Sequence, residues 1–470
     1  MPDEKFDVII VGAGPAGVSA AITAARGGLH VALLERGEYA GAKNVQGAIL
    51  YTKMLADILP EFWKDPGCPL ERYITQQNVM ITGENSFIRL GYMNDRWQTE
   101  PHNCYSIIRV AFDKWYAKKA EEAGAEIYTG VTVSKAIQKD GKVIGIETSG
   151  GDQLLADVVI ACDGVNSMLA QSIGLIDEWK ADEVALGVKE ILSLPKEKIE
   201  DRFALEGNEG ATFELFGKIT KGMLGYCFLY TNKDSLSLGV GCKLSHFQKA
   251  KMNPAQLLEM AKQHAAIRRF IRDAKPIEYS AHLIPEGGFN SLPPLYTDGF
   301  LIAGDAAQMV NPSHREGSNL AMTAGKLAAE TCIEAKKKGD FSKSILGEYQ
   351  KKIENSFIIP DLEEHKDLEA KVEENLDLLT VYPEIASKAL FDYFTVDGRS
   401  KKEIQKGIFR RVLKIRSLSN LTRDFWKIYT YEERSKKESQ NGDFKFSKTK
   451  MVFNIVKDLW GFGRAMLKRR

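Results

Sequence analysis

The chain has 470 residues, of which 44% are hydrophobic, and its 64 Lys and Arg almost balance its 63 Asp and Glu. This length predicts two or three subdomains rather than one simple core. No uninterrupted apolar run reaches the length that spans a bilayer, so we do not expect an integral membrane protein.

The cysteines and the charge distribution bear on location and partners. None of the six cysteines belongs to a C-x-x-C pair, and no signal peptide precedes the first predicted strand, which predicts buried thiols in a reducing compartment, the cytoplasm. Residues 401–470 hold 20 Lys and Arg against 7 Asp and Glu. This basic segment predicts an anionic partner, which is a membrane surface, a nucleic acid or an acidic protein.

Residues 6–36 predict a strand, a glycine-rich turn, a helix and a second strand. The buried strand 7–11 runs into a G-x-G-x-x-G turn made of Gly12, Ala13, Gly14, Pro15, Ala16 and Gly17. In this motif the first glycine permits the tight turn, the second lets the backbone approach a pyrophosphate, and the third lets the helix pack on the strand. The amides at the helix start favour negative charge.

The second strand, at 30–34, is followed by Glu35 and Arg36. An acidic residue at this offset accepts hydrogen bonds from a ribose hydroxyl and repels the extra phosphate of NADP. The choice therefore lies between NAD and the ADP half of FAD. The glycine-rich loop that follows, with Lys43 and Asn44, is expected to lead toward the reactive end of the cofactor.

Three further segments follow the same logic. An insertion is predicted at 51–98, then a helix at 111–122 preceded by Arg109, and strands at 126–129, 131–138 and 143–148. A buried strand at 155–162 leads into Asp163 and Gly164, at the end of the strand where open α/β sheets bind ligands. Residues 183–244 predict an antiparallel sheet that covers a substrate, in which no residue can be given a catalytic role.

The last ligand-facing turn begins after a short apolar strand at 300–303. It carries Gly304 and Asp305, and its loop reaches Asn319 before a small-residue helix predicted at 320–336. Four turns thus compete for one ligand, and one extended dinucleotide explains them better than four separate sites. Arg109 could instead be a surface helix cap.

Together these turns resemble the FAD-binding superfamily that includes p-hydroxybenzoate hydroxylase, geranylgeranyl reductases and electron-transfer-flavoprotein quinone oxidoreductases. The resemblance implies that Gly12, Gly14, Gly17, Glu35 and Arg36 hold the ADP half, that Asp163 and Gly164 lie near the pyrophosphate and ribityl chain, and that Asp305 and Arg109 serve the ribityl chain. It extends the set of FAD contacts to Pro15, Ala16, Lys43, Asn44, Val133, Gly304, Gly317, Ser318 and Asn319.

Three segments narrow the resemblance to the FixC family, whose members are quinone-reductase subunits of electron-bifurcating flavoprotein complexes. These segments are 41–48 with its Lys43-Asn44 pair, Val188-Lys189-Glu190, and the loop 311–322 with its His314-Arg315-Glu316-Gly317 core, and the similarity spans roughly residues 5–430. The fold expected from this resemblance is α/β, with a Rossmann-type FAD-binding domain of the glutathione reductase or p-hydroxybenzoate hydroxylase type at 1–180 and 296–345. An antiparallel-sheet quinone domain at 181–295 and a helical region with a basic tail at 346–470 complete it.

The resemblance also implies partners. No cysteine lies beyond Cys332, so a four-thiolate iron–sulfur module cannot form near the C-terminus, and we expect no metal site. A separate ferredoxin-like subunit would supply the cluster, and two electron-transfer-flavoprotein subunits would deliver electrons that leave to menaquinone or ubiquinone. A second Rossmann fingerprint, which would bind NAD(P)H, is missing, so we expect electrons to come from another protein. No nucleic-acid-binding module is recognisable, so nucleic acid is not an expected partner.

Gly317 and His314 are the candidate catalytic residues. The amides from Gly317 to Asn319 would stabilise negative charge at the N1–C2=O edge of the flavin. His314 would donate a proton to quinone or be a structural histidine of its loop.

The apolar stripe at 451–467 with its flanking cations predicts a helix in a bilayer interface, on the cytoplasmic face of the membrane, or a helix docked on the body or a partner. Two other functions stay open. One is a geranylgeranyl-type reductase that saturates isoprenoid double bonds, and the other is a flavin-bearing scaffold that relays electrons without a small substrate of its own.

Overall fold

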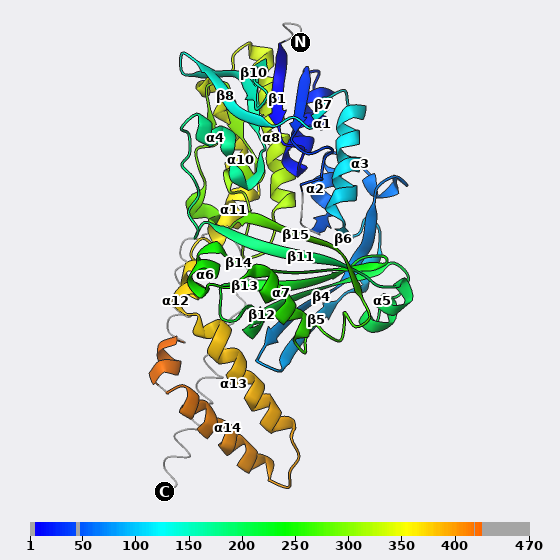
Figure 1. The fold of residues 1–470 in the computed structure, drawn as a ribbon, viewed down its shortest axis with the longest axis vertical. Helices are drawn as coiled ribbons and strands as arrows, with labels where there is room; N and C mark the ends of the chain where they lie inside the picture. The colour runs from blue at the N-terminus through cyan, green and yellow to red at the C-terminus, as the bar shows by residue number, and fades with distance from the viewer. Residues whose placement is uncertain (1–4, 44–47, 418, 425–470) are drawn as a thin grey trace. The chain divides into compact units, whose positions relative to one another are not determined.

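The computed structural model describes residues 5–43, 48–417 and 419–424. Residues 1–404 form one compact unit, and residues 405–470 form a second. The first unit contains two large β-sheets with helices packed on them, and in Figure 1 the blue strands of one sheet lie above the long green strands of the other.

The first sheet is built around the first strand of the chain. Its strands are β1 Phe6–Val11, β2 Val31–Glu35, β7 Glu126–Thr129, β8 Val133–Lys139, β9 Lys142–Thr148, β10 Gln153–Ala161, β16 Tyr296–Thr297 and β17 Phe300–Ile302. The order is β16-β17-β10-β1-β2-β7, and β8 and β9 form an antiparallel extension of β10. All of these strands except the short β16, which was not predicted, lie within two residues of the predicted ones, which confirms the Rossmann-type sheet.

Parallel pairing brings the predicted ligand turns together. β1 pairs in parallel with both β2 and β10, and β10 pairs in parallel with β17. The four strands therefore end at one edge of the sheet. Gly12, Asp163 and Gly304 follow three of these ends directly or after one residue, and Glu35 closes the fourth.

The second sheet crosses the first unit beneath this edge. Its strands are β3 Ala48–Tyr51, β4 Leu70–Thr82, β5 Phe87–Met93, β6 Cys104–Ile107, β11 Val184–Ser193, β12 Glu209–Gly217, β13 Gly225–Thr231, β14 Ser235–Lys243 and β15 Lys275–Pro285. The order is β15-β11-β14-β13-β12-β4-β6-β3, with β5 paired to β4. Every pairing is antiparallel except that of β12 with β4, which is parallel.

Residues 48–107 differ from the expectation. We predicted an insertion at 51–98 and an antiparallel-sheet domain at 181–295, but residues 48–107 supply four strands of the second sheet. The prediction failed because β4 finds its partner β12 more than a hundred residues later, and local periodicity does not report such a pairing. The assignment of the two sheets to cofactor and quinone stays a prediction.

Fourteen α-helices, besides six short 3₁₀ helices, are present in the described residues. They are α1 Pro15–Arg26, α2 Thr52–Ala56, α3 Arg109–Glu122, α4 Met168–Ser172, α5 Lys196–Phe203, α6 Leu244–Ala250, α7 Pro254–Gln263, α8 Ser318–Lys338, α9 Lys343–Leu346, α10 Glu348–Glu354, α11 Ile358–Glu364, α12 Leu368–Glu374, α13 Asp377–Phe394 and α14 Lys401–Ile415. Most described residues from 348 to 415 are helical, as predicted, and α14 continues into the second unit. The predicted apolar stripe at 451–467 lies outside the described residues. None of the helices that the structure describes is long and apolar enough to cross a membrane.

All six cysteines are free thiols. Five of them are buried, and Cys68 is half-buried. No three His, Cys, Asp or Glu side chains within the described ranges gather as a metal site.

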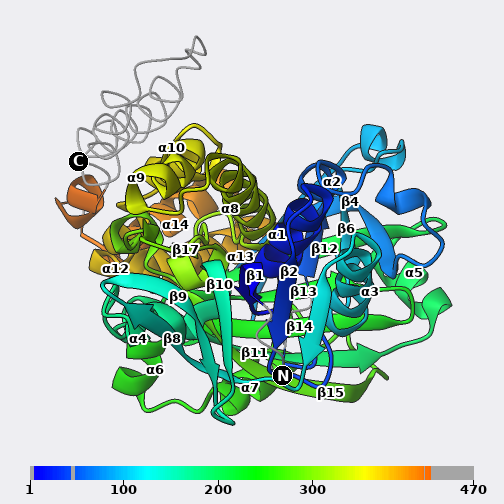
Figure 2. The same cartoon turned by 90° about the horizontal axis from the view of Figure 1, so that it is seen from above.

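Helices α1 and α8 lie side by side, as Figure 2 shows from above. The backbones of the two helices come closest where Gly325 of α8 meets Ala16 of α1. A Cβ atom at Gly325 of α8 would lie 2.0 Å from the backbone oxygen of Ala16 in α1, and one at Gly17 would lie 1.9 Å from the backbone oxygen of Gly12. Close approach of backbones thus holds the phosphate-facing end of α1 in place.

Replacing Gly325 with alanine is therefore expected to destabilise the protein. The gain in helix propensity is about 1 kcal/mol, but a Cβ at 2.0 Å from a backbone atom overpacks the contact at a cost of about 3 kcal/mol, the upper end of the usual range. The expected net loss is about 2 kcal/mol. Urea unfolding followed by circular dichroism measures the change. Gly150→Ala is the control, since its Cβ would meet side-chain atoms only at 3.5 and 3.6 Å. Equal stability of the two variants would contradict this account of the α1–α8 contact.

Candidate cofactor and substrate site

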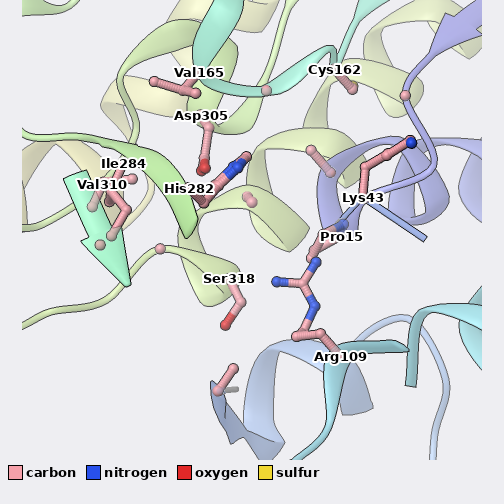
Figure 3. Close-up of a pocket in the computed structure, with 18 of the residues that line it drawn as sticks. Pro15, Lys43, Arg109, Cys162, Val165, His282, Ile284, Asp305, Val310 and Ser318 are labelled. Atoms are coloured by element: carbon pink, nitrogen blue, oxygen red, sulfur yellow. The ribbon is translucent and has the colours of Figure 1, made fainter. Parts of the chain in front are cut away.

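One continuous cavity collects the predicted turns. It is lined by residues that follow β1, β2, β10 and β17, by the start of α3 and of α8, and by strands of the second sheet. Figure 3 shows Arg109, Asp305 and Ser318, from three of these elements, around a common space. The predicted residues that line it are Gly12, Gly14, Pro15, Ala16, Glu35, Arg36, Lys43, Arg109, Val133, Asp163, Gly164, Asp305, His314, Gly317 and Ser318.

The remaining predicted residues have other positions. Gly17 and Gly304 do not line the cavity, and a Cβ at Gly304 would lie 2.9 Å from the side chain of Ala16. Asn319 is buried behind the cavity wall and donates from Nδ2 to Oε2 of Glu316 at 2.6 Å. Asn44 lies outside the described residues. Gly17 and Gly304 thus shape the cavity wall from behind and do not face the ligand.

The glycine turn forms an open cradle at one end of the cavity. Gly12 has φ +104°, and a Cβ there would lie 2.2 Å from the backbone oxygen of Cys162, so only glycine fits. Gly14 is extended, and a Cβ there would meet nothing within 4 Å. That empty space borders the first amides of α1, where a phosphate group binds well.

Glu35 ties this cradle to the loop after β2. Its Oε2 accepts a hydrogen bond from the amide of Ala13 at 3.0 Å, and its Oε1 accepts one from the amide of Gly37 at 2.7 Å. The carboxylate is therefore held at the cavity wall. Each oxygen keeps a second lone pair that can accept from a ribose hydroxyl.

Asp163 presents an unsatisfied acceptor. Its Oδ2 accepts from the amide of Leu169 at 3.0 Å, but its Oδ1 is buried without a partner. Burial raises the pKa of this carboxyl to about 6, although neighbouring backbone amides oppose the shift. A buried acceptor without a partner is costly. A ligand donor at this position would satisfy it.

Arg109 carries the positive charge in the middle of the cavity. Its guanidinium donates from Nε and Nη2 to the two carboxylate oxygens of Asp113, at 2.8 and 2.9 Å. Burial lowers the pKa of Arg109, but the charges of Asp113 and Asp305 outweigh it and raise the pKa overall. Burial raises the pKa of Asp305, and Arg109 opposes that rise. Since its side chain is only 11% exposed and lines the cavity, Arg109 is not a surface cap.

The loop before α8 is stapled by Asn311. Its Oδ1 accepts from the amides of Ser313 and His314, both at 3.1 Å, and its backbone pairs with Glu316. Gly317 and Ser318 then open a helix of 21 residues whose first amides face the cavity. A helix start of this length favours negative charge in front of it.

His314 contacts a second histidine. Its Nε2 lies 2.7 Å from Nε2 of His365, and the two rings stack with centroids 4.7 Å apart. One nitrogen must donate and the other accept in this contact. A role for His314 in proton donation stays a prediction.

The second sheet contributes the residues that sequence reasoning missed. Its apolar and aromatic side chains in the cavity include Val188, Tyr226, Phe228, Tyr230 and Ile284, its charged ones are Lys189 and Glu214, and Glu286 follows its strand β15 directly. Burial lowers the pKa of Lys189 to about 8, although Glu278 opposes the shift from 3.6 Å. Charged residues inside strands give no local signal of which face they occupy. Only the Val188-Lys189-Glu190 resemblance touched this group.

An ion pair spans the aromatic end of the cavity. The Arg315 guanidinium pairs with the carboxylate of Glu214 and lies 5.7 Å from the ring centroids of Phe216 and Tyr226. Burial raises the pKa of Glu214, while Arg315 opposes that rise. The exposed fractions of the two side chains are 22% and 14%. Removing one partner would leave a charge poorly solvated.

We therefore expect Arg315→Gln to destabilise the protein by about 3 kcal/mol. The double variant Arg315→Gln with Glu214→Gln should recover at least 1 kcal/mol of this, by the logic of a double-mutant cycle. Chemical unfolding at pH 7 measures all three proteins. Lys351→Gln breaks an exposed pair with Glu348 and should cost under about 0.5 kcal/mol. If Arg315→Gln costs no more than this control, the half-buried pair is not the support we describe.

Comparison with known proteins decides the family. Residues 7–172 match the FAD dependent oxidoreductase family, and residues 370–431 match the ETF-QO/FixC family C-terminal domain. Protein FixC of Azorhizobium caulinodans is 44% identical over 431 residues, which cover 91% of this chain and 99% of that protein. The chain belongs to the FixC family. FixC proteins of Azotobacter vinelandii and Escherichia coli K12 are 45% and 43% identical, with 91% of this chain and 99% of each relative covered.

Solved structures agree on the fold. A geranylgeranyl bacteriochlorophyll reductase-like protein from Thermoplasma acidophilum superposes with a TM-score of 0.67 at 20% identity, over 87% of this chain and 98% of that one. The flavin-dependent brominase Bmp2 superposes with a TM-score of 0.61 at 17% identity, over 87% of this chain and all of that one. At these identities the likeness concerns the fold alone.

This member of the FixC family is an FAD-dependent oxidoreductase of electron transfer, and its residues fit FAD. Gly14 leaves room for a pyrophosphate, Glu35 is fixed where a ribose would lie, and the unpaired Oδ1 of Asp163 accepts a donor. Asp305 and Arg109 line the continuing cavity. The NAD alternative is set aside.

Gly14→Val tests the cradle. The side chain would enter the cavity rather than the core, and the extended backbone at Gly14 accepts valine. We expect thermal stability of the apoprotein to change by less than about 0.5 kcal/mol, while FAD affinity falls at least tenfold, or about 1.4 kcal/mol. Titration with FAD by fluorescence quenching reports the affinity. Gly150→Val, in an exposed turn, should bind FAD normally, and unchanged FAD affinity in Gly14→Val would exclude the cradle.

Proposed function

We propose that the protein accepts electrons from two electron-transfer-flavoprotein subunits and a ferredoxin-like subunit, and passes them to menaquinone or ubiquinone in an electron-bifurcating complex. One observation carries the proposal. The cavity continues from the dinucleotide turns of the first sheet into the aromatic compartment of the second sheet, which suits a flat apolar quinone ring.

FAD, when bound, can take up electrons singly and deliver a pair. The chain's own residues would then orient the cofactor and stabilise the negative charge that develops on it. Asp305 and Arg109 would hold the ribityl chain, and the amides at Gly317 and Ser318 would face the flavin edge where negative charge develops. The guanidinium of Arg315, fixed by Glu214, would add positive charge beside the aromatic compartment.

The partners are proposed from the family and the sequence. The ETF-QO/FixC domain at 370–431 supports an electron-transfer-flavoprotein as donor. The sequence holds no second Rossmann fingerprint that would bind NAD(P)H, and no cysteine follows Cys332. Electrons from a ferredoxin-like protein subunit account for both observations.

Location at the cytoplasmic face of the membrane is part of the same proposal. Quinones dissolve in lipid, and the basic segment 401–470 suits an anionic membrane surface. The apolar stripe at 451–467 would make the contact with the membrane. Deletion of residues 450–470 should abolish sedimentation with anionic vesicles while leaving FAD content unchanged.

Rapid mixing tests the quinone assignment. The FAD-loaded protein is photoreduced without oxygen and mixed with a short-chain menaquinone or ubiquinone, while flavin absorbance is followed. We expect reoxidation at least a hundredfold faster than free reduced FAD shows, and no saturation of a prenyl double bond in the product. Prenyl saturation would favour the geranylgeranyl-type reductase. No acceleration by the isolated protein would favour the electron-relay scaffold.

A further inference from the structure

We propose that Glu286, Glu369, Lys243, Glu373 and His246 form a proton-delivery route from solvent to the aromatic end of the cavity. The inference rests on the proposed quinone reduction. It concerns a cluster of titratable groups that neither the dinucleotide turns nor the Arg315–Glu214 pair uses. Glu286 is the proton donor to quinone, and the other four are positioning and relay residues behind it.

The inner end of the route is Glu286. It follows β15 directly and lines the cavity together with Tyr226 and Pro312. Its amide donates to the backbone oxygen of Glu183 at 2.8 Å, and the next amide, of Gly287, donates to Oε1 of Gln308 at 3.2 Å. These bonds fix the position of Glu286 beside the loop that leads to α8. A carboxyl group thus faces the compartment proposed for the quinone ring.

The middle of the route is formed by β14 and α12. Nζ of Lys243 lies 2.8 Å from Oε1 of Glu369 and 3.3 Å from Oε2 of Glu373. Nε2 of His246, on α6, lies 3.0 Å from the other oxygen of Glu373. Four titratable side chains therefore lie in succession at contact distance.

Exposure is greatest at Glu373 at the outer end of the cluster, whereas the neighbouring His246 side chain is 12% exposed. The side chain of Lys243 is 9% exposed, that of Glu369 is 20% exposed, and that of Glu373 is 38% exposed. The outer carboxylate therefore reaches solvent, and the ammonium group does not. Glu286 and Lys243 stand at the ends of the two strands that flank β11, because Val184 of β11 lies opposite Pro285 and Ala185 lies opposite Lys243. The inner carboxyl and the outer cluster are therefore neighbours at one end of the second sheet.

The groups that face Glu286 explain why it holds a proton. The titratable groups within electrostatic range of Glu286 are Glu369 on α12, Lys243 and Cys242 on β14, and Tyr226 on β13. Burial is the largest influence and Glu369 the next, and together they raise the pKa of Glu286 to about 8 against the opposing charge of Lys243. At neutral pH the group is a carboxylic acid, which is the state that donates.

The reaction balances with this route. A quinone takes two electrons from the reduced cofactor and two protons to become a quinol. For each proton, an O–H bond at Glu286 breaks and an O–H bond at a quinone oxygen forms. Glu286 is then a carboxylate, and it regains a proton that enters from solvent at Glu373 and His246 and passes Lys243 and Glu369. Two such cycles complete one quinol.

Glu286→Gln in the full-length, FAD-loaded protein tests the donor. Glutamine has nearly the shape of the neutral acid, so folding is preserved. Photoreduced protein is mixed with menaquinone, which needs protons, or with ferricenium, which takes an electron without one. We expect quinone reduction to slow at least tenfold and ferricenium reduction to change less than twofold. Glu363→Gln, which changes an exposed side chain of α11, should leave both rates unchanged.

Glu369→Gln is the second variant. It interrupts the route behind the donor, so slow quinone reduction with normal ferricenium reduction is again expected. If the wild-type protein reduces quinone and both variants keep its rate, the proton route is wrong and the proposed function stands. If the wild-type protein does not reduce quinone, the proposed function itself fails.

Proton binding also has a readout without activity. The folded-state pKa of Glu286 lies above the ordinary value of about 4.3, so the folded protein holds a proton that the unfolded chain releases. Its stabilising effect is complete below that ordinary value and is lost as the pH rises toward about 8. The melting temperature of the apoprotein should fall over this range, and the fall should be smaller in Glu286→Gln. An identical pH dependence in the two proteins would overturn the assignment.

Discussion

The parallel register of β1 with its two neighbours is the constraint on which the site depends. Val8 lies opposite both Val31 of β2 and Val158 of β10, and Val159 lies opposite Phe300 of β17. This alignment ends four strands at one edge and places a glycine or a carboxylate at each end. A shift of one residue in any pair would offset the ends of the two strands, and the turns that follow them, by about 3.3 Å. Close backbone contact between α1 and α8 then fixes the turn that faces the phosphates.

Charge in the cavity is arranged in pairs whose members oppose each other. Arg109 lies between Asp113 and Asp305, Arg315 pairs with Glu214, and Lys189 lies near Glu278. Each cation offsets the desolvation of a carboxylate at a place where a bare charge would be costly. The aromatic compartment can thus stay largely apolar and still hold groups that bind, orient and move protons.

Local signals in the sequence were sufficient for the first sheet and its turns. Gly12, Gly14 and Glu35 act within one strand–helix–strand unit, and their spacing alone predicted where they lie. The second sheet required more than local signals. Its strand β4 pairs with β12 across a long separation, and Glu214 shares β12 with the core residues Phe213 and Leu215. Whether such a glutamate faces a cavity depends on register, which single-sequence periodicity does not contain. Glu286 was missed for the same reason, since its neighbours Lys243 and Glu369 are distant in the chain.

The interleaving of the two sheets along the chain has a consequence for biosynthesis. The second sheet is opened by residues 48–107 and closed by β15, and the first sheet is finished only by β17 and α8. The ribosome must therefore synthesise some 340 residues before α8, the last element that lines the cavity, is complete. The cofactor can therefore bind only late in translation. Strand β4 stays unpaired with β12 until more than a hundred further residues have been translated.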